Sequence, residues 1–337
     1  MELTKETRQF ILNMPKVELH LHLEGAFTYE MLFNLIKKYG GDPFVKNIND
    51  LEQRFVFKYF PHFIETWFWK NKFFREPEDF EDSTYFTLKN LHQQNVIYVE
   101  AFYSPWDFLP NGLSVADITE STLAAVIRAE KDFGIRCQLI ADISREHGWE
   151  TAIDRLNDVA LFRDRGVIGI GLGGSEQKYP PEPFEDVYKA AREQGFHVVA
   201  HAGEAAGPES IWAAMQKLNI ERIGHGVRAV EDATLVETLK RTQIPLEICV
   251  TSNLKTGVYK SIETHPIKYF FDNGLFVTIN SDDPAMFGAT ITDEFLLLYE
   301  KLNFSLEAIK MLTINAVRAS FLQESEKEMI LNKISNF

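Results

Sequence analysis

The chain has 337 residues, of which 45% are hydrophobic, and it carries a formal net charge of -14 at neutral pH. An acidic protein repels nucleic-acid phosphates and anionic lipid surfaces, so a nucleic-acid substrate and a membrane partner are both disfavoured. The N-terminal residues lack the charge and apolar pattern of a signal peptide, and we expect a cytoplasmic protein. The two cysteines, Cys137 and Cys249, lie in apolar runs and are expected to be core residues rather than a disulfide pair.

Short, almost continuously apolar runs, typical of buried parallel strands, recur along the chain. In chain order, the predicted strands are Val17–Leu23, Val96–Tyr103, Ile135–Ile143, Val167–Gly173, Phe196–His201, Arg222–Gly226, Ile244–Val250 and Leu275–Ser281. Amphipathic stretches typical of helices separate them, the clearest being Ser114–Phe133, Trp149–Arg163, Pro183–Gln194, Pro208–Leu218 and Glu231–Leu239. Eight strands alternating with helices predict an α/β fold, a (β/α)8 TIM barrel, in a single domain over residues 1–337.

The chain is longer than a minimal barrel requires, and the excess falls in two places. The segment Leu51–Leu91, after the first strand, is expected to add helices, and the segment after Asp293 is expected to form two or three closing helices. The aromatic-rich stretch Phe55–Phe74 is expected to pack mainly on the barrel, with two or three of its side chains lining a ligand pocket.

Histidines and carboxylates occur where the predicted strands end. His20 and His22 alternate along the first strand and therefore share one face. His201, His225 and Asp282 end or follow the fifth, sixth and eighth strands. Because active sites of such barrels lie at the carboxyl ends of the strands, we expect all five side chains to meet at one mouth of the barrel.

Three imidazoles and one carboxylate suit a single catalytic zinc ion, which keeps one position for water. The candidate ligands are His20, His22, His201 and Asp282. Zinc would lower the pKa of a bound water to about 7 and so provide hydroxide at neutral pH.

Three neighbouring residues are candidates for the accompanying proton transfers and contacts. His225 is expected near the water as a base or an electrostatic stabiliser. If a helical turn follows His201, Glu204 returns to the rim of the pocket, where it could shuttle a proton to the substrate. Asp283 directly follows Asp282 and should therefore point elsewhere, toward the substrate. Gly224 and Gly226 are expected to clear space for His225.

Several of these segments resemble one known family. The sequence is similar to the adenosine/AMP deaminase family of zinc hydrolases, and most similar to its adenosine deaminase branch. The matching motifs are Met14–Gly25, His201–Glu204, Gly224–Gly226 and Ser281–Pro284, accompanied by Tyr98–Glu100, Tyr103–Pro105 and Thr251–Leu254.

The resemblance implies hydrolytic deamination of a small 6-aminopurine nucleoside, adenosine or deoxyadenosine, with one zinc ion per chain. It implies zinc ligation by His20, His22, His201 and Asp282. It also implies that Glu204 protonates ring N1, and that His225 and Asp282 orient the attacking oxygen. Asp283 would hydrogen-bond N7, the backbone of Gly174 would hydrogen-bond N3, and His22 and Glu24 would lie beside the substrate.

Three departures from the family pattern concern the sugar. Glu24 stands where adenosine deaminases commonly have Asp, Ser175 replaces a frequent Asp, and Phe102 occupies a position that often holds Arg. Glutamate at position 24 resembles relatives that act on adenine and other 6-aminopurines. Deamination of adenine or of aminodeoxyfutalosine is therefore the alternative to adenosine.

Two more distant alternatives are an amidohydrolase with a different substrate and a nucleoside-binding protein without catalysis. Many barrel amidohydrolases use a bridging lysine and two metal ions, whereas Gly173 and Gly174 stand at the end of the fourth predicted strand. The presence of both Glu204 and His225 argues against a protein that only binds nucleosides.

Overall fold

The computed structural model describes residues 3–337. Within this range, eight strands form one sheet in sequential order, and each strand runs parallel to the next. The strands are β1 (Lys16–His22), β2 (Val96–Tyr103), β3 (Arg136–Asp142), β4 (Val167–Gly171), β5 (His197–Ala202), β6 (Arg222–His225), β7 (Leu246–Ile248) and β8 (Val277–Ile279). Every predicted strand is therefore present.

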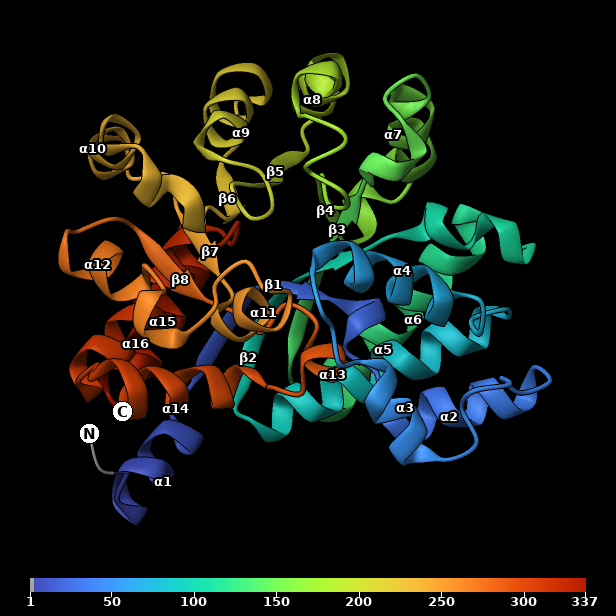
Figure 1. Cartoon of the computed structure of the whole chain (residues 1–337), viewed down its shortest axis with the longest axis horizontal. Coiled ribbons are helices and arrows are strands. Elements are labelled where there is room, and N and C mark those ends of the chain that lie inside the picture. Colours follow the sequence, from blue (N-terminus) through green and yellow to red (C-terminus); the bar gives the residue numbers. More distant parts are fainter. Residues whose placement is uncertain (1–2) are drawn as a thin grey trace.

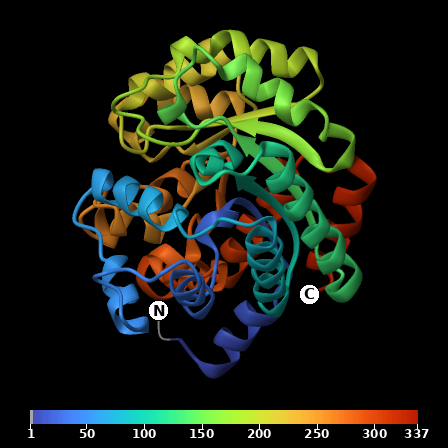
Figure 2. The same ribbon diagram turned by 90° about the vertical axis from the view of Figure 1, so that its right-hand side faces the viewer.

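The sheet closes where β1 meets the segment that follows β8. Leu21 and Asp282 form a parallel bridge. The His22 N–H donates to the Asp282 carbonyl at 2.9 Å, and the Asp282 N–H donates to the His20 carbonyl at 3.0 Å. These contacts complete a (β/α)8 barrel, as predicted, with helices around the strands (Figures 1 and 2). Closure brings residues of the first and last strands side by side.

Helices alternate with the strands and cover the outside of the barrel (Figure 1). The α-helices are α1 (Lys5–Asn13), α2 (Tyr29–Lys38), α3 (Ile48–Arg54), α4 (Phe60–Asn71), α5 (Pro77–Gln93), α6 (Val115–Phe133), α7 (Ala152–Ala160), α8 (Glu185–Glu193), α9 (Pro208–Ala213), α10 (Ala233–Thr242), α11 (Val250–Lys255), α12 (Ile267–Asp272), α13 (Pro284–Phe287), α14 (Ile291–Leu302), α15 (Leu306–Ala319) and α16 (Glu324–Ser335). The 3-10 segments are η1 (Leu23–Gly25), η2 (Pro105–Asn111), η3 (Arg145–His147), η4 (Arg163–Arg165), η5 (Glu182–Phe184), η7 (Val227–Glu231) and η8 (Ile262–Thr264), and η6 (Ala214–Leu218) is π-helical.

Local sequence signals explain where helices begin and end, as α6 illustrates. Ser114 Oγ accepts the Asp117 N–H at 3.1 Å, and the Asp117 carboxylate accepts the Ser114 N–H, which completes a capping box. Gly134 ends the helix with φ of 73°, a conformation that glycine adopts without steric cost. Both ends of this helix agree with the prediction from sequence.

The predicted excess forms two groups of helices. Between β1 and β2, helices α2 to α5 build a second apolar cluster beside the barrel, in which Phe55, Phe73 and Phe74 are buried. After β8, helices α14 to α16 close the fold, and α14 begins at Ile291, slightly before the predicted start. Both free cysteines are buried, as expected. Among residues 3–337, no helix combines the length and the apolarity needed to cross a lipid bilayer.

Candidate active site

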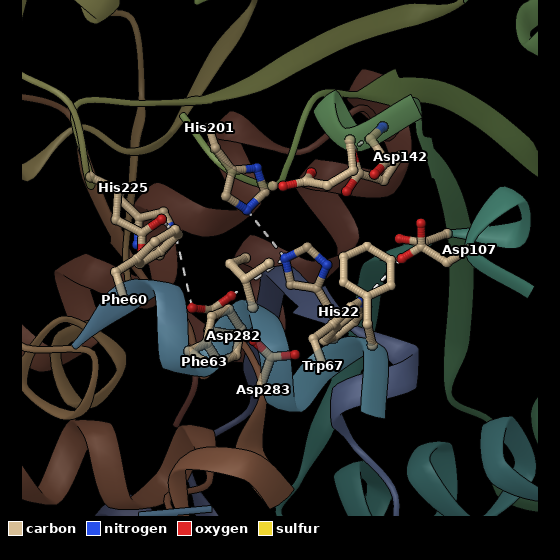
Figure 3. Close-up of a pocket in the computed structure, with 17 residues that line it drawn as sticks. His22, Phe60, Phe63, Trp67, Asp107, Asp142, His201, His225, Asp282 and Asp283 are labelled. Atoms are coloured by element: carbon tan, nitrogen blue, oxygen red, sulfur yellow. Dashed lines mark hydrogen bonds and ion pairs between the residues drawn. The ribbon is translucent and has the colours of Figure 1, made fainter. Parts of the chain in front are cut away.

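The four predicted metal ligands meet at the carboxyl ends of β1, β5 and β8. Their ligand atoms all lie within 4.8 Å of one another, and all four side chains are buried. His201 Nε2 lies 3.0 Å from His20 Nε2 and 3.2 Å from His22 Nε2. Asp282 Oδ1 lies 3.4 Å from Nε2 of both His20 and His22. Figure 3 shows His22 and His201 pointing toward each other across this cluster.

The spacing of these atoms fits a tetrahedral zinc ion. Zinc–nitrogen bonds of about 2.0–2.1 Å place neighbouring ligand atoms of a tetrahedron about 3.3 Å apart. The donors, three imidazole nitrogens and one carboxylate oxygen, are also of the type that zinc prefers. Cys249 lies close to the same group, but burial raises the pKa of its thiol well above its usual value, which disfavours the thiolate needed for ligation.

Buried charges inside the barrel fix the orientation of His20. Its Nδ1 lies 2.8 Å from Glu247 Oε2, and the other oxygen of Glu247 accepts Arg222 Nε at 2.5 Å. Arg222 also pairs with Glu100, and Glu100, Arg222 and Glu247 have at most 1% of their surface exposed. A carboxylate that accepts Nδ1–H leaves the lone pair of Nε2 free to face a metal. No sequence motif indicates these supporting residues.

Two of the site residues have an unusual backbone conformation. His225 has φ of 57° and Asp282 has φ of 63°, both in the left-handed region that side chains other than glycine rarely adopt. A Cβ on Gly224 would lie 2.9 Å from His20 Cε1 and 3.2 Å from His201 Cα. Gly224 therefore makes room for two of the predicted ligands, while its effect on the neighbouring His225 stays a prediction.

A cavity opens beside the cluster (Figure 3). Its lining includes every residue proposed for proton transfer or base recognition, namely Glu204, His225, Asp283 and Gly174, together with the predicted ligands His22, His201 and Asp282. His20 lies behind them, fully buried. The residues predicted from separate strand ends therefore border one common space.

One helix supplies the apolar wall of this cavity. Residues Phe60, Phe63, Ile64, Trp67 and Phe68 of α4 follow the spacing of one helical face, and all five line the cavity. Figure 3 shows three of them along the same side. Four aromatic side chains thus reach the pocket, rather than the expected two or three. Trp67 Nε1 donates to Asp107 Oδ2 at 2.8 Å, which anchors this wall to η2.

Comparisons with known proteins agree with this arrangement. A family profile described as "Adenosine deaminase" matches residues 15–337. The chain belongs to the adenosine deaminase family. It is a hydrolytic deaminase, and curated relatives include adenine deaminases from Hahella chejuensis (34% identical over 330 residues, 98% of each chain) and Ectopseudomonas mendocina (37% identical over 306 residues, 91% of this chain and 97% of the relative).

Solved structures show the same fold. The adenine deaminase from Arthrobacter aurescens superposes with a TM-score of 0.92 at 31% identity, covering 96% of this chain and 98% of that one. A zinc-bound amidohydrolase from Burkholderia ambifaria gives a TM-score of 0.89 at 24% identity, covering 100% and 97%. At that identity, the second likeness concerns the fold alone.

In the deaminase, the loop after β5 holds Glu204 in the cavity, but not through the expected helical turn. No helical turn follows His201, and α9 begins only at Pro208. Instead, the buried carboxylate of Glu176 accepts backbone N–H groups of residues 203–206 at 2.6–3.1 Å. One side chain thus satisfies four successive backbone donors, and it fixes the loop that carries Glu204.

Two carboxyl groups in the cavity have strongly perturbed acidity. Burial, reinforced by the negative charge of Asp282, raises the pKa of Glu204 well above its usual value. The same two causes raise the pKa of Asp283, whose Oδ1 is buried without a hydrogen-bond partner among the described residues. Both groups are therefore suited to carry a proton at neutral pH and to donate it to a ligand.

His225 faces both the cluster and the cavity. Its Nε2 lies 3.7 Å from Glu204 Oε2 and 3.8 Å from Asp282 Oδ2. Burial lowers the pKa of His225 to about 4, so the ring is neutral at ordinary pH. On its other side, Nδ1 lies 3.2 Å from Nδ2 of Asn253, a residue to which the sequence analysis assigned no role.

Glu24 lies differently from the expected substrate contact. Its Oε1 accepts the Ser104 N–H at 2.8 Å, and it lines a separate small pocket with Tyr103 and Phe80. It does not line the larger cavity. Phe102, at the position where the family often has Arg, stacks on the His22 ring with centroids 5.0 Å apart.

Lys70 of α4 is a further buried charge that no motif indicated. Its side chain is fully buried, with Nζ 2.7 Å from Asn71 Oδ1 and 3.6 Å from the centroid of the Trp67 ring. Burial lowers its pKa to about 8, and the carboxylates of Glu24 and Asp283 oppose that shift. Lys70 lies near the end of α4, far along the sequence from the end of any strand, so strand-end motifs could not indicate it.

Proposed function

We propose that this protein is a zinc-dependent hydrolytic deaminase whose principal substrate is adenine, converted to hypoxanthine and ammonia. The observation that carries the proposal is the convergence of His20, His22, His201 and Asp282 on one buried point beside Glu204. Adenine replaces adenosine as the first choice because the curated relatives with near-complete coverage are named adenine deaminases.

The role of the metal follows from its ligand set. A zinc ion on these four groups would act as a Lewis acid and lower the pKa of water to about 7, which supplies a nucleophile at neutral pH. The remaining tasks, protonating the ring, orienting the base and excluding bulk water, belong to the residues of the chain. In the overall reaction, the oxygen of water bonds to C6, the C6–N6 bond breaks, and the amino group leaves as ammonia.

Glu204 is the proposed proton donor to ring N1. A purine carbon resists attack unless the adjacent nitrogen takes up the electron pair that addition displaces, and protonation of N1 allows this. The raised pKa of Glu204, caused mainly by burial, keeps this carboxyl protonated before attack. Its position 3.7 Å from His225 Nε2 then places the acid beside the attacking oxygen.

The other ring contacts come from groups with free hydrogen-bonding capacity. Asp283 carries a proton because its pKa is raised, and its unpartnered Oδ1 suits it to donate to N7. Gly174, which lines the cavity, offers its N–H to N3. The aromatic face of α4 would cover the flat base and keep bulk water from it.

The charge of the cavity argues against nucleotide substrates. Among the described residues, no lysine or arginine lines it, whereas Asp107, Asp142 and Glu146 do. A phosphate group would meet these carboxylates without a cation to pair with it. A free base carries no such charge, and Glu24, the expected sugar contact, does not line this cavity.

Adenosine is the second candidate, and the same polar wall favours it. Ser144, Asp142 and Glu146 line the cavity and could accept hydrogen bonds from ribose hydroxyls. The two candidates differ only in whether a ribose occupies the part of the cavity lined by these three residues.

A substrate panel on metal-analysed enzyme separates these candidates. The reaction is followed by the ultraviolet loss of the aminopurine spectrum. We expect kcat/KM for adenine to exceed that for adenosine, deoxyadenosine and aminodeoxyfutalosine, and AMP to be the poorest substrate. Adenosine outpacing adenine would transfer the proposal to the second candidate. No ammonia from any 6-aminopurine, with one zinc bound per chain, would refute both.

A further inference from the structure

His225 is linked to a chain of hydrogen bonds that leads away from the cavity. Beyond it lie Asn253, in the second half of α11, and His265, just before α12. Both are almost completely buried, with exposed fractions of 0% and 4%. Neither residue touches the metal cluster or lines the cavity, and neither has a role in the function proposed above.

This series of hydrogen bonds begins at a backbone N–H, which can only act as a donor. The Ile267 N–H donates to His265 Nδ1 at 3.3 Å. A peptide N–H can only donate, so His265 Nδ1 must accept and carries no proton. Burial lowers the pKa of His265 to about 3, so the ring is neutral and holds its single proton on Nε2.

The next two links follow from the first. His265 Nε2 lies 3.1 Å from Asn253 Oδ1, which can only accept, so this contact is a hydrogen bond from His265 to Asn253. The amide of Asn253 is thereby oriented, with Nδ2 toward His225 Nδ1 at 3.2 Å. An amide NH₂ can only donate, so His225 Nδ1 is an acceptor and the proton of its ring lies on Nε2.

We propose that His265 and Asn253 are positioning residues that fix the tautomer of His225, so that His225 presents a protonated Nε2 to the cavity. With Nδ1 engaged as an acceptor and Nε2 already protonated, His225 has no free lone pair for a proton from water. It serves as a hydrogen-bond donor that orients the attacking oxygen, and not as the base. That role agrees with the one the resemblance implies for His225, and the new element is the pair of residues that enforces it. The kinetic part of the inference rests on the proposed deaminase function.

Nitrogen-15 NMR of the histidine rings in the zinc-loaded enzyme tests the tautomers without reference to activity. Each ring nitrogen gives a different resonance when protonated and when it holds a lone pair, and single-histidine substitutions would assign the nine histidines. We expect a protonated Nε2 and an unprotonated Nδ1 for both His225 and His265. A proton on Nδ1 of His225 in the wild-type enzyme overturns the proposal, whether or not any variant folds.

Two substitutions reverse the direction of the hydrogen bonds between His265, Asn253 and His225, and a third preserves it. In Asn253→Asp, a carboxylate replaces the amide donor, so His225 must donate from Nδ1 instead. His265→Glu similarly accepts from the Asn253 amide and turns Oδ1 toward His225, whereas His265→Gln keeps a donor where Nε2 was. An inverted tautomer that leaves geometry intact costs about 10²–10⁴-fold in kcat.

The expected pattern is specific. Asn253→Asp and His265→Glu should move the His225 proton to Nδ1 and lower kcat by about 10²-fold or more, with KM changed little. His265→Gln should keep the wild-type tautomer and lose no more than a few-fold. Equal losses in His265→Gln and His265→Glu, with zinc content unchanged, would contradict the relay. Wild-type tautomers in an enzyme that deaminates no aminopurine would instead refute only the proposed function.

Discussion

Gly25 offers a way to displace Asp283 without altering its chemistry. Gly25 lies in η1, directly after the predicted ligand strand, and its backbone does not require the left-handed region. A Cβ added there would lie 1.8 Å from Asp283 Oδ1, where ordinary contacts begin at 3.4 Å. In Gly25→Ala, the carboxyl of Asp283 must therefore retreat by about 1.6 Å, because the methyl group cannot move.

A shift of that size removes the proposed hydrogen bond to N7. Misplacement of a positioning group by about 1 Å can cost about 10²-fold, so we expect kcat/KM for the aminopurine to fall by about 10²-fold. The metal cluster lies on other residues, and zinc content should stay at one per chain. Steady-state kinetics and metal analysis on the same samples check both expectations.

Two other glycines supply matched comparisons. Gly224→Ala places its methyl 2.9 Å from His20 Cε1 and 3.2 Å from His201 Cα, so it should lose zinc together with activity. Gly207→Ala meets only the flexible carboxylate of Glu209 and should leave activity unchanged. If Gly25→Ala retained full activity with Asp283 displaced in its crystal structure, Asp283 would have no part in recognising the base.

Three further predictions address the metal, the proton donor and the buried charges. Removing the metal with a chelator should abolish deamination, zinc should restore it, and a chelator already saturated with zinc should have no effect. Glu204→Gln should lower kcat by at least about 10²-fold with zinc retained, and should abolish the alkaline fall of kcat/KM, which marks the loss of the proton held by the raised pKa of Glu204. Burial raises the pKa of Glu294 from 4.5 to about 7, so its stabilisation is complete below pH 4.5 and is lost as the pH rises through about 7. The free energy of unfolding of the wild type, measured in urea, should therefore fall relative to Glu294→Gln by up to about 3 kcal/mol across that range; parallel curves would refute this reading.

The barrel and its cluster could be predicted because both depend on short patterns. His20 and His22 share a face through the two-residue period of a strand, and the carboxyl end of a parallel strand defines the mouth of a barrel. Strand periodicity also located β7 and β8, although both are only three residues long in the structure. Pro245 directly precedes β7, and α11 begins shortly after β7 ends. The strand is therefore shorter at both ends than the predicted Ile244–Val250.

The residues that support the cluster could not be found in this way. Asn253 lies in α11 and His265 twelve positions later, between η8 and α12, and their pairing depends on how the segment between them folds. Glu176, which accepts backbone N–H groups of the loop that carries Glu204, comes from a different βα connection. Nothing in the local sequence distinguishes such buried polar residues from solvated ones, because their partners are chosen by the closure of the barrel.

The left-handed backbone at Asp282 explains how two consecutive carboxyl groups serve one cavity. In a regular strand, adjacent side chains point to opposite faces, so Asp282 and Asp283 should not share a pocket. At φ of 63°, Asp282 breaks that alternation, and both side chains line the cavity. A non-glycine residue held in this region costs about 1–3 kcal/mol. Glycine at position 282 would remove that cost, but it would also remove the carboxylate. The strain is therefore present because the residue at this sharp turn must carry a predicted metal ligand. The hydrogen bonds of Asp282 to His20 and His22 across the barrel closure offset it.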